Sequence, residues 1–513
     1  MKSMIIVGAG IGGLSAGCYA QMNGYKTRIL EMHNLPGGCC TSWKRKGYTF
    51  DLCIEWLLGT GHGNVMNQIW QELGALKGKR ITNFDVFSHV KGIDGRMISF
   101  YVDPDRLEQH LKEISPEDKK PIEEFCNGLR TFTKINLFRP LLKPFKLMNL
   151  FEIIKVFLEL CPYFKTIGLA EEIQMADFAD RFKDPLLRQA FKYIFFQDQI
   201  TFPLLPFYMN VACATNKNAG FPEGGSLGFA RSIEKRYKTL GGEIQYDTRV
   251  KKIIVKGDSA VGVVLQDGTE QFADIVISAC DGRTTIFDML DGKYVDETIE
   301  TLYNKLIDEP HMIYPGVVST FLGVKREVKG EPHSVTYFLD DAEAARLPAV
   351  LQSSIVVQHR SLYSPEFSPP GKSVLLGYYY SEYDYWKKLY EDKDAYYKEK
   401  QKVSDFVIEY LDKIYPNLKD QVEVIDVSTP VTLMRYTGNF KGSVMAWKPL
   451  TKAEDLTKKM IKKDGMKLPG LKNFYITGQW VSVGGLIRVA SWGRHVIQFV
   501  CKNDKKKFTA WVD

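Results

Sequence analysis

Residues 4–24, with the sequence MIIVGAGIGGLSAGCYAQMNG, decide the fold of this chain. A short apolar run at residues 4–8 has the composition of a buried parallel strand, and a run of small residues suited to a helix follows it. Between them stands the spacing G-x-G-x-x-G. Its first glycine permits a tight turn, its second lets the backbone approach a pyrophosphate, and its third lets the helix pack closely on the strand. The stretch therefore predicts a dinucleotide site built on Gly8, Gly10, Ile11, Gly12 and Gly13.

An acidic residue stands where such a site needs one. The expected second strand, KTRIL, ends at Glu31, eighteen residues after Gly13. A carboxylate at this distance accepts hydrogen bonds from the adenosine ribose and repels a 2′-phosphate. A second glycine turn follows at Gly37 and Gly38, and GYTFD follows that at residues 47–51.

The pattern E-x(4)-PGG followed by GYTFD resembles the phytoene desaturase, carotenoid isomerase and retinol saturase family of flavoproteins. The resemblance continues through residues 221–253, 273–282 and 471–500. It implies FAD as the cofactor, with Gly37 and Gly38 along the flavin diphosphate. It also implies contacts to FAD from the residues Val250, Gly478, Gln479, Gly485 and Leu486. Gln479 stands where many flavoproteins of this superfamily have aspartate, and its amide can hold the same ribityl hydroxyl.

The length of the chain and the order of its blocks predict several lobes. At 513 residues the chain exceeds what one hydrophobic core usually supports. We expect an α/β fold whose Rossmann-like, glutathione-reductase-like FAD domain is assembled from residues 1–85, 220–300 and 465–513. Residues 104–218 are expected to form a helical subdomain. Residues 301–464 carry strand-like runs such as SSIVVQ and KSVLLGYYY, and we expect them to form a substrate-binding domain with an antiparallel sheet.

Two residues are candidates for a catalytic role. Glu55 follows the second glycine turn, and burial beside a flavin would raise its pKa enough for acid–base work at a C–H bond. Arg488 lies near the expected flavin ring, where it could pair with a lipid carboxylate or stabilise negative charge on a reduced flavin. The alternatives are that Glu55 is a surface carboxylate and that Arg488 forms a salt bridge in the core, and both stay open.

Aromatic residues gather in two places that suit an apolar pocket. One is YYYSEYDYW at residues 378–386, and the other is the stretch 431–447, which offers Arg435, Tyr436 and Lys441 as polar groups. Pockets for small molecules are mostly apolar with a few placed polar groups, so we expect a long apolar substrate. A partly exposed sheet edge is the alternative for the first cluster.

One predicted helix carries an apolar stripe on which two interpretations stay open. The stripe consists of Leu147, Leu150, Phe151, Ile154, Leu158 and Cys161. A basic, aromatic-rich segment precedes it, so the helix either packs on the core or lies in a bilayer interface and admits a lipid to the pocket.

Composition excludes other classes of protein. The net charge of +7 comes without a dense basic stripe, so no nucleic-acid partner is expected. The nine cysteines show no metal-ligand spacing, so we expect no metal and a reducing compartment. The first strand leaves no room for a signal peptide and no apolar window is long enough to span a bilayer, which favours the cytoplasm, with peripheral membrane contact left open.

The expected function is that of an FAD-dependent oxidoreductase acting on C–C or C=C bonds of a long unsaturated lipid. It would desaturate, saturate or isomerise a carotenoid, retinoid or fatty-acyl compound. No second dinucleotide motif with the right context appears, so the electron partner is oxygen, a quinone, another protein or a transiently bound nucleotide. Two alternatives are a flavin amine oxidase and a non-catalytic lipid-binding flavoprotein.

Overall fold

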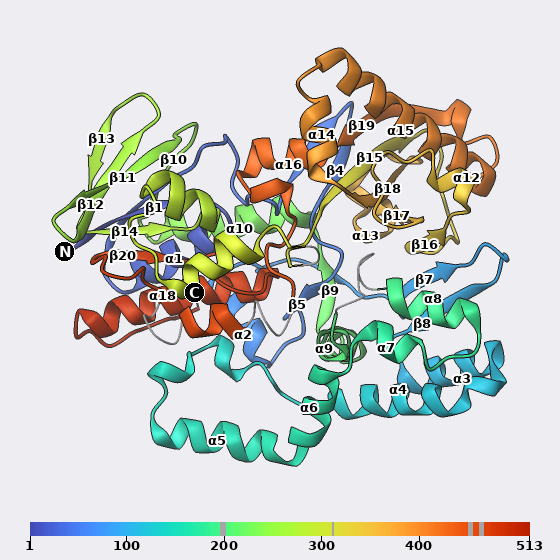
Figure 1. Ribbon diagram of the computed structural model, residues 1–513, viewed down its shortest axis with the longest axis horizontal. Coiled ribbons are helices and arrows are strands. Elements are labelled where there is room, and N and C mark those ends of the chain that lie inside the picture. Colours follow the sequence, from blue (N-terminus) through green and yellow to red (C-terminus); the bar gives the residue numbers. More distant parts are fainter. Residues whose placement is uncertain (195–201, 310–311, 450–454, 461–465, 513) are drawn as a thin grey trace.

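A five-stranded parallel sheet lies at the centre of one lobe of the computed structural model (Figure 1). The structure describes residues 1–194, 202–309, 312–449, 455–460 and 466–512. The strand order is β10-β2-β1-β14-β20. Its strands come from three distant parts of the chain: β1 (Ser3–Val7), β2 (Lys26–Leu30), β10 (Glu243–Gln245), β14 (Ile275–Ser278) and β20 (Phe474–Ile476). The predicted boundary between residues 464 and 465 lies outside the described residues.

Three helices pack together beside this sheet because small residues let them approach. They are α1 (Ile11–Met22), α10 (Gly225–Thr239) and α18 (Leu486–Asn503), and α1 contacts both of the others. A Cβ atom on Gly17 would lie 2.7 Å from the ring of Tyr237, and one on Gly493 would lie 2.6 Å from the carbonyl oxygen of Gly12. Any larger residue at these glycines would push the helices apart, so the small-residue pattern of α1 sets the packing of this lobe.

The second lobe is built on a seven-stranded sheet of order β19-β15-β18-β17-β16-β7-β8. All its pairings are antiparallel except that of β16 with β7. Five strands come from the expected region: β15 (Gly316–Val324), β16 (Ser334–Phe338), β17 (Ser354–His359), β18 (Ser373–Ser381) and β19 (Val422–Ser428). The other two, β7 (Val86–Lys91) and β8 (Met97–Tyr101), precede the helical region, so the sheet extends beyond the predicted segment. The long helix α15 (Lys393–Ile414) shares a hydrophobic core with one face of this sheet.

The residues between β8 and β9 (Ala219–Pro222) are mostly helical where they are described, and most of these helices share one core. They are α3 (Pro104–Ile114), α4 (Lys119–Phe132), α5 (Leu150–Leu160), α6 (Phe164–Glu172), α7 (Met175–Ala179), α8 (Pro185–Tyr193) and α9 (Leu204–Thr215). Helix α5 begins at a capping box in which Asn149 and Glu152 bond each other's backbone N–H groups. It lies at the outer end of this region, below the two sheets in Figure 1.

Shorter elements complete the fold. A three-stranded antiparallel sheet of β11 (Val250–Lys256), β12 (Ser259–Leu265) and β13 (Glu270–Phe272) flanks the first lobe. The remaining short elements are β3 (Ser42–Arg45), β4 (Tyr48–Asp51), β5 (Leu57–Leu58), α2 (Val65–Glu72), β6 (Ile81–Thr82) and α16 (Pro430–Thr437). Within the described part of the chain, no helix combines the length and apolarity that a membrane crossing needs.

Candidate active site

The glycine loop between β1 and α1 has the geometry of a phosphate cradle. Gly8 has a φ of +97° and donates its N–H to the carbonyl of Leu30. A Cβ atom on Gly13 would lie 2.0 Å from the carbonyl oxygen of Gly8, whereas one on Gly10 would have none of the residues that the structure describes within 4 Å, its own neighbours in the chain apart. Gly10 starts α1 without a side-chain cap, and the first turn holds no acidic residue. The N-terminal N–H groups of α1 therefore face open space suited to an anionic diphosphate.

Glu31 closes the loop from the end of β2. One carboxylate oxygen accepts the N–H of Ala9 at 2.6 Å, and the other accepts the N–H of His33 at 2.9 Å. Burial raises the pKa of Glu31, while these backbone N–H bonds act to lower it. The structure thus places the predicted ribose-binding carboxylate against the glycine loop.

Three further segments with predicted cofactor contacts reach the same region. Gly37 donates its N–H to the carbonyl of Ala9 at 2.9 Å, which lays the second glycine turn, with Gly38, along the first loop. Thr248, two residues before Val250, donates its N–H to the carbonyl of Glu31 at 2.8 Å.

The remaining contact comes from the C-terminal part of the chain. A Cβ atom on Gly12 would lie 2.9 Å from the Cα atom of Gly478, so the turn before the half-buried Gln479 also abuts the loop. Gly485 and Leu486 lie farther along, at the start of α18.

A cavity of about 1040 Å³ extends from the start of α18 to the seven-stranded sheet. Its volume reaches the upper end of the range of about 300–1,000 Å³ usual for ligand pockets. Gly485, Leu486 and Arg488 line one part, and Ser319, Leu376, Tyr378 and Tyr380 of the sheet line another. A third side is lined mostly by apolar residues within 137–146, here called the wall segment.

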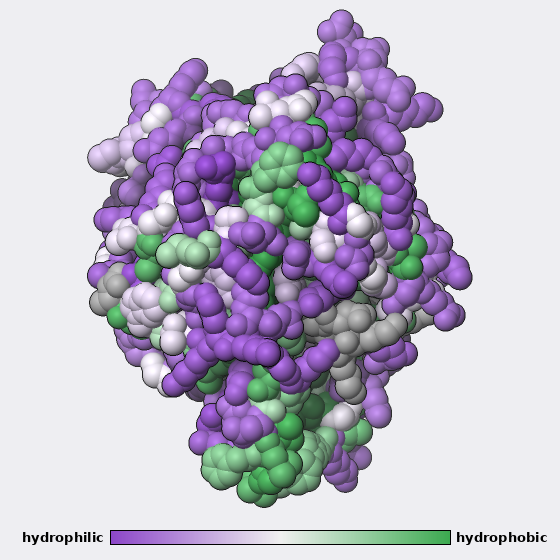
Figure 2. Space-filling view, turned by 90° about the vertical axis from the view of Figure 1, so that its left-hand side faces the viewer, coloured by the Kyte–Doolittle hydropathy of each residue, from purple (hydrophilic) through white to green (hydrophobic). Residues whose placement is uncertain are grey.

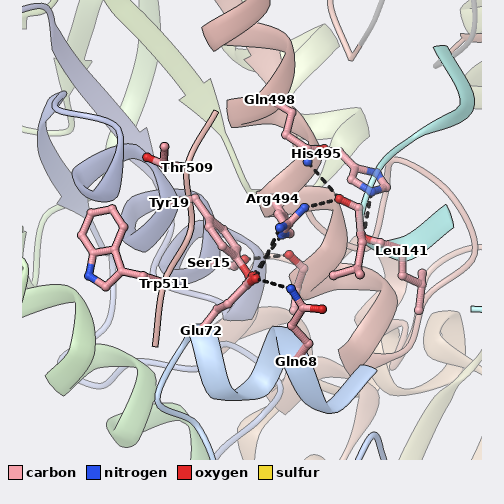
Figure 3. Close-up of polar contacts among 12 residues, drawn as sticks. Ser15, Tyr19, Gln68, Glu72, Leu141, Arg494, His495, Gln498, Thr509 and Trp511 are labelled. Atoms are coloured by element: carbon pink, nitrogen blue, oxygen red, sulfur yellow. Dashed lines mark hydrogen bonds and ion pairs between the residues drawn. The ribbon is translucent and has the colours of Figure 1, made fainter. Parts of the chain in front are cut away.

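The wall segment is held in place by side chains of α18 (Figure 3). Arg494 and Gln498 both donate to the carbonyl oxygen of Leu142, Gln498 at 2.9 Å. The Nε2 atom of His495 lies 2.9 Å from the carbonyl oxygen of Leu141. Burial lowers the pKa of His495 to about 3, so its ring is neutral and Nε2 donates to that oxygen. The helix that begins beside the expected flavin thus also fixes the wall of the cavity.

Glu55 faces both this cavity and the sheet. The hydroxyl of Tyr378 donates to its Oε1 atom at 2.9 Å, although the two residues are 323 positions apart. Burial raises the pKa of Glu55, opposed by the charge of Arg360 and by the hydrogen bond from Tyr378. A buried carboxyl with a raised pKa, in contact with an apolar cavity, is suited to give or take a proton at a bound substrate.

Arg488 lies in the first turn of α18 and lines the cavity, as a ligand for an anionic group would. Within the described residues its guanidinium has no ion pair or hydrogen bond to protein. The other predicted polar groups lie elsewhere: Arg435 bonds Tyr390, Tyr436 is 47% exposed, and Lys441 pairs with Asp308. None of these three lines the cavity.

The structure adds residues that the sequence had not singled out. Asp281 follows β14 and accepts the backbone N–H groups of Thr284 and Phe440, and burial raises its pKa to about 6. Asp281 follows the carboxyl end of a parallel strand, where ligands of such sheets bind, and this position could have identified it from the sequence as a candidate site residue. Trp56 and Asn210 both line the cavity, and the indole N–H of Trp56 donates to the side-chain oxygen of Asn210 at 2.9 Å. No local sequence pattern predicts this pair.

The parallel sheet, the phosphate cradle and the adjoining cavity define a flavin-dependent oxidoreductase. Residues 11–490 match the family described as flavin containing amine oxidoreductase, and the chain belongs to that family. The match confirms the prediction that the cofactor is FAD.

Comparison with curated proteins gives relatives of the predicted kind. The chain is 27% identical to the chloroplastic prolycopene isomerase of Daucus carota over 86% of its own length and 71% of that protein. It is 24% identical to the all-trans-retinol 13,14-reductase of Danio rerio, over 86% and 76% of the two chains. It is 23% identical to the lycopene-forming phytoene desaturase of Pseudescherichia vulneris, over 88% and 90%. These relatives confirm the predicted resemblance to carotenoid isomerases, retinol saturases and phytoene desaturases.

Solved structures agree on the fold. An oxidoreductase from Methanosarcina mazei superposes with a TM-score of 0.57 at 16% identity, covering 97% of this chain and all of the other. A likeness at this identity concerns the fold alone, and it supports the α/β architecture described above.

Proposed function

We propose that this protein is an FAD-dependent oxidoreductase that acts on C–C or C=C bonds of a long unsaturated lipid, such as a carotenoid, a retinoid or a fatty-acyl compound. The observation that carries the proposal is the cavity of about 1040 Å³, which joins the start of α18 to a mostly apolar wall. The relatives act, by their names, on prolycopene, retinol and phytoene, which are long or polyunsaturated molecules.

The residues around the cradle fit FAD. Glu31 would accept hydrogen bonds from the ribose, and the loop from Gly8 to Gly13 with Gly37 and Gly38 would hold the diphosphate. Val250, Gly478, Gln479, Gly485 and Leu486 would complete the contacts toward the adenine and the flavin. When bound, FAD supplies hydride-transfer chemistry. Its electron partner would be oxygen, a quinone, another protein or a transient nucleotide.

Two side chains are proposed to serve the reaction inside the cavity. Glu55 would give or take a proton at the substrate, because it is buried, keeps contact with the cavity and has a raised pKa. Arg488 would bind an acidic group of the substrate or stabilise negative charge at the flavin ring. Binding of neutral lipids and of their carboxylic acid analogues would separate the two roles of Arg488. If Arg488 binds the substrate, Arg488→Gln should weaken binding of the acids and leave binding of the neutral lipids unchanged.

We further propose that the protein contacts a membrane through α5 and its neighbours. The predicted apolar stripe faces outward, with Leu150 73%, Phe151 75% and Leu158 62% exposed. Figure 2 shows apolar residues gathered at the lower end of the molecule, where Figure 1 places α5. Phe145, in the wall segment, is 53% exposed and also lines the cavity, so the apolar surface leads to the pocket.

We also propose a division of the chain into three domains, which the same architecture supports. An FAD-binding domain made of residues 1–85, 220–300 and 465–513 is supported by the three origins of the parallel sheet. A helical subdomain at 104–218 and a substrate-binding domain at 301–464 would complete it, with β7 and β8 added to the sheet of the last. A cytoplasmic protein that binds a membrane peripherally fits these features.

The test is a visible spectrum of the FAD-loaded protein without oxygen, before and after lipids extracted from its own cells are added. Bleaching of the oxidised flavin would identify a lipid that donates hydride. Repeating the titration with chemically reduced protein, and following its reoxidation or the isomer composition of the lipid, tests saturation and isomerisation. Peroxide release with amines would instead support an amine oxidase. Lipid binding without any redox or isomer change would support a non-catalytic flavoprotein.

A further inference from the structure

A second, smaller cavity lies directly behind Glu55. Its volume is about 50 Å³, against about 1040 Å³ for the substrate cavity. Four residues line both cavities: Glu55, Trp56, Tyr378 and Tyr380. The hydrogen bond from Tyr378 to Glu55 therefore belongs to the partition between the two spaces. The smaller space is here called the rear chamber.

The strand register explains why the rear chamber is polar. On β16, Val335 and Tyr337 pack toward α15, so Ser334 and Thr336 point to the opposite face, where both line the chamber. Thr336 is paired with Val356, and Val356 with Tyr378, so the chamber and the partition share one face of the sheet. A face that binds only hydrocarbon would have no need of these hydroxyl groups.

We propose that the rear chamber holds water and exchanges protons with the carboxyl group of Glu55, and that Tyr378 positions this carboxyl at the partition. The inference deepens the proposed function, because it assigns the source of the proton that Glu55 delivers to or takes from the substrate. Tyr378 acts through Glu55 and is a positioning residue.

The size and chemistry of the chamber select water as its occupant. A cavity needs about 10–15 Å³ of such volume for one water molecule and two to four polar partners for it. The chamber offers room for a few waters and too little for a ring or a lipid chain. The hydroxyls of Ser334, Thr336 and Tyr378, the carboxyl of Glu55 and the ring of His333 supply the partners. Burial lowers the pKa of His333 to about 3, so this ring is neutral.

Several charged and titratable groups face Glu55. Burial raises its pKa, and Arg360, fully buried with its guanidinium on the carbonyl of Ile54, limits the rise. Tyr378 and Tyr363 have pKa values raised by burial and by the nearby Glu55, so both stay protonated near neutral pH.

The proposed transfer balances without any redox partner. When Glu55 has lost its proton to the substrate, a chamber water gives one proton to the carboxylate and takes another from solvent. When Glu55 has gained a proton, the flow is reversed. Neither direction changes the electron count of Glu55 or of the water.

Infrared difference spectroscopy of the purified protein, wild type minus Glu55→Gln at equal FAD content, tests the proposal. Over a pH titration, the protonated form of Glu55 would appear as a carboxylic acid band that is absent from Glu55→Gln. A jump into D₂O then measures how fast this band exchanges. Thr336→Val removes a chamber hydroxyl at constant volume, and Ser334→Val fills the chamber. Thr320→Val is the matched control, because Thr320 is buried in the same sheet, on the strand face that Val318 and Leu322 turn toward α15.

We expect the band in wild type, exchange at least tenfold slower in Thr336→Val and Ser334→Val, and no change in Thr320→Val. In Tyr378→Phe the pH at which the band disappears should shift, which a purely structural role would not cause. Exchange as fast in both chamber variants as in wild type would overturn the proposal, as would a crystal structure with a dry chamber. None of these measurements uses a lipid, so a failure of the proposed function would leave them unaffected.

Discussion

Arg494 of α18 and Glu72 of α2 form a buried ion pair, with Nε 3.0 Å from Oε2 and side chains only 9% and 3% exposed. A second bond of 3.3 Å joins Nη2 to Oε1, so the contact is bidentate. Glu72 also accepts the hydroxyl of Tyr19 at 2.6 Å and the amide of Gln68 at 2.9 Å (Figure 3). The remaining guanidinium arm reaches the wall segment, so one arginine links α18 and α2 to the side of the cavity.

Glu72→Ala should destabilise the protein by about 3–5 kcal/mol, because it leaves the guanidinium of Arg494 buried without its partner. The midpoint of urea unfolding checks this. The control is Glu409→Ala, which breaks the pair with Arg346, whose side chains are 48% and 45% exposed. An exposed pair contributes about 0–1 kcal/mol, so equal effects of the two substitutions would contradict the assigned role of Glu72.

Two glycines of the cradle should respond differently to alanine. Gly13→Ala places a Cβ atom 2.0 Å from the carbonyl oxygen of Gly8 and should lower the melting temperature of the flavin-free protein. Gly10→Ala meets no protein atom, so it should leave that temperature unchanged and weaken FAD binding at least tenfold by crowding the diphosphate. Thermal melts and FAD titrations measure both. Unaltered FAD affinity in Gly10→Ala would argue against the diphosphate position.

Phe151→Asp and Leu158→Asp should reduce binding to lipid vesicles severalfold without lowering the melting temperature, because both side chains are already exposed. Co-sedimentation with vesicles made of lipid from the source cells measures this. Tyr397→Asp, at a residue 59% exposed on α15, is the matched control. Equal losses in the control and in the α5 variants would show that general surface charge, and not α5, governs binding.

Asp281 should make stability fall as pH rises. Burial raises its pKa from 3.8 to about 6, so the unfolded chain releases this proton first. Between about pH 4 and pH 6 the folded state then binds more protons than the unfolded state, and the free energy of unfolding decreases with pH, by about 3 kcal/mol in all. Asp281→Asn should abolish this part of the decrease. Urea titrations of both flavin-free proteins across this range give the difference, and parallel pH curves would refute the assignment.

Much of the cofactor site could be predicted because its signals are local. Strand, glycine loop and helix adjoin in residues 4–24, and Glu31 follows within one further strand, so short-range spacing carries the geometry. The surroundings of Glu55 could not be predicted in this way. Tyr378 bonds Glu55 across 323 positions, and Val335 of β16 pairs with His89 of β7 across 246 positions, so these neighbours depend on long-range pairing. Arg435 and Tyr436 seemed suitable for the pocket by composition and lie outside it.

By itself the sequence determined the dinucleotide cradle, the FAD cofactor and the kinship with lipid-modifying flavoproteins, since glycine spacing and strand–helix patterns depend on neighbours within a few tens of residues. Only the tertiary structure decided which way the α5 stripe faces, because a helix shows the same periodicity whether its apolar side packs on a core or stays exposed. It also decided that Arg494 joins α2 to the wall segment and that a polar chamber lies behind Glu55. Such contacts arise when distant segments bury their surfaces together, which no spacing along the chain encodes.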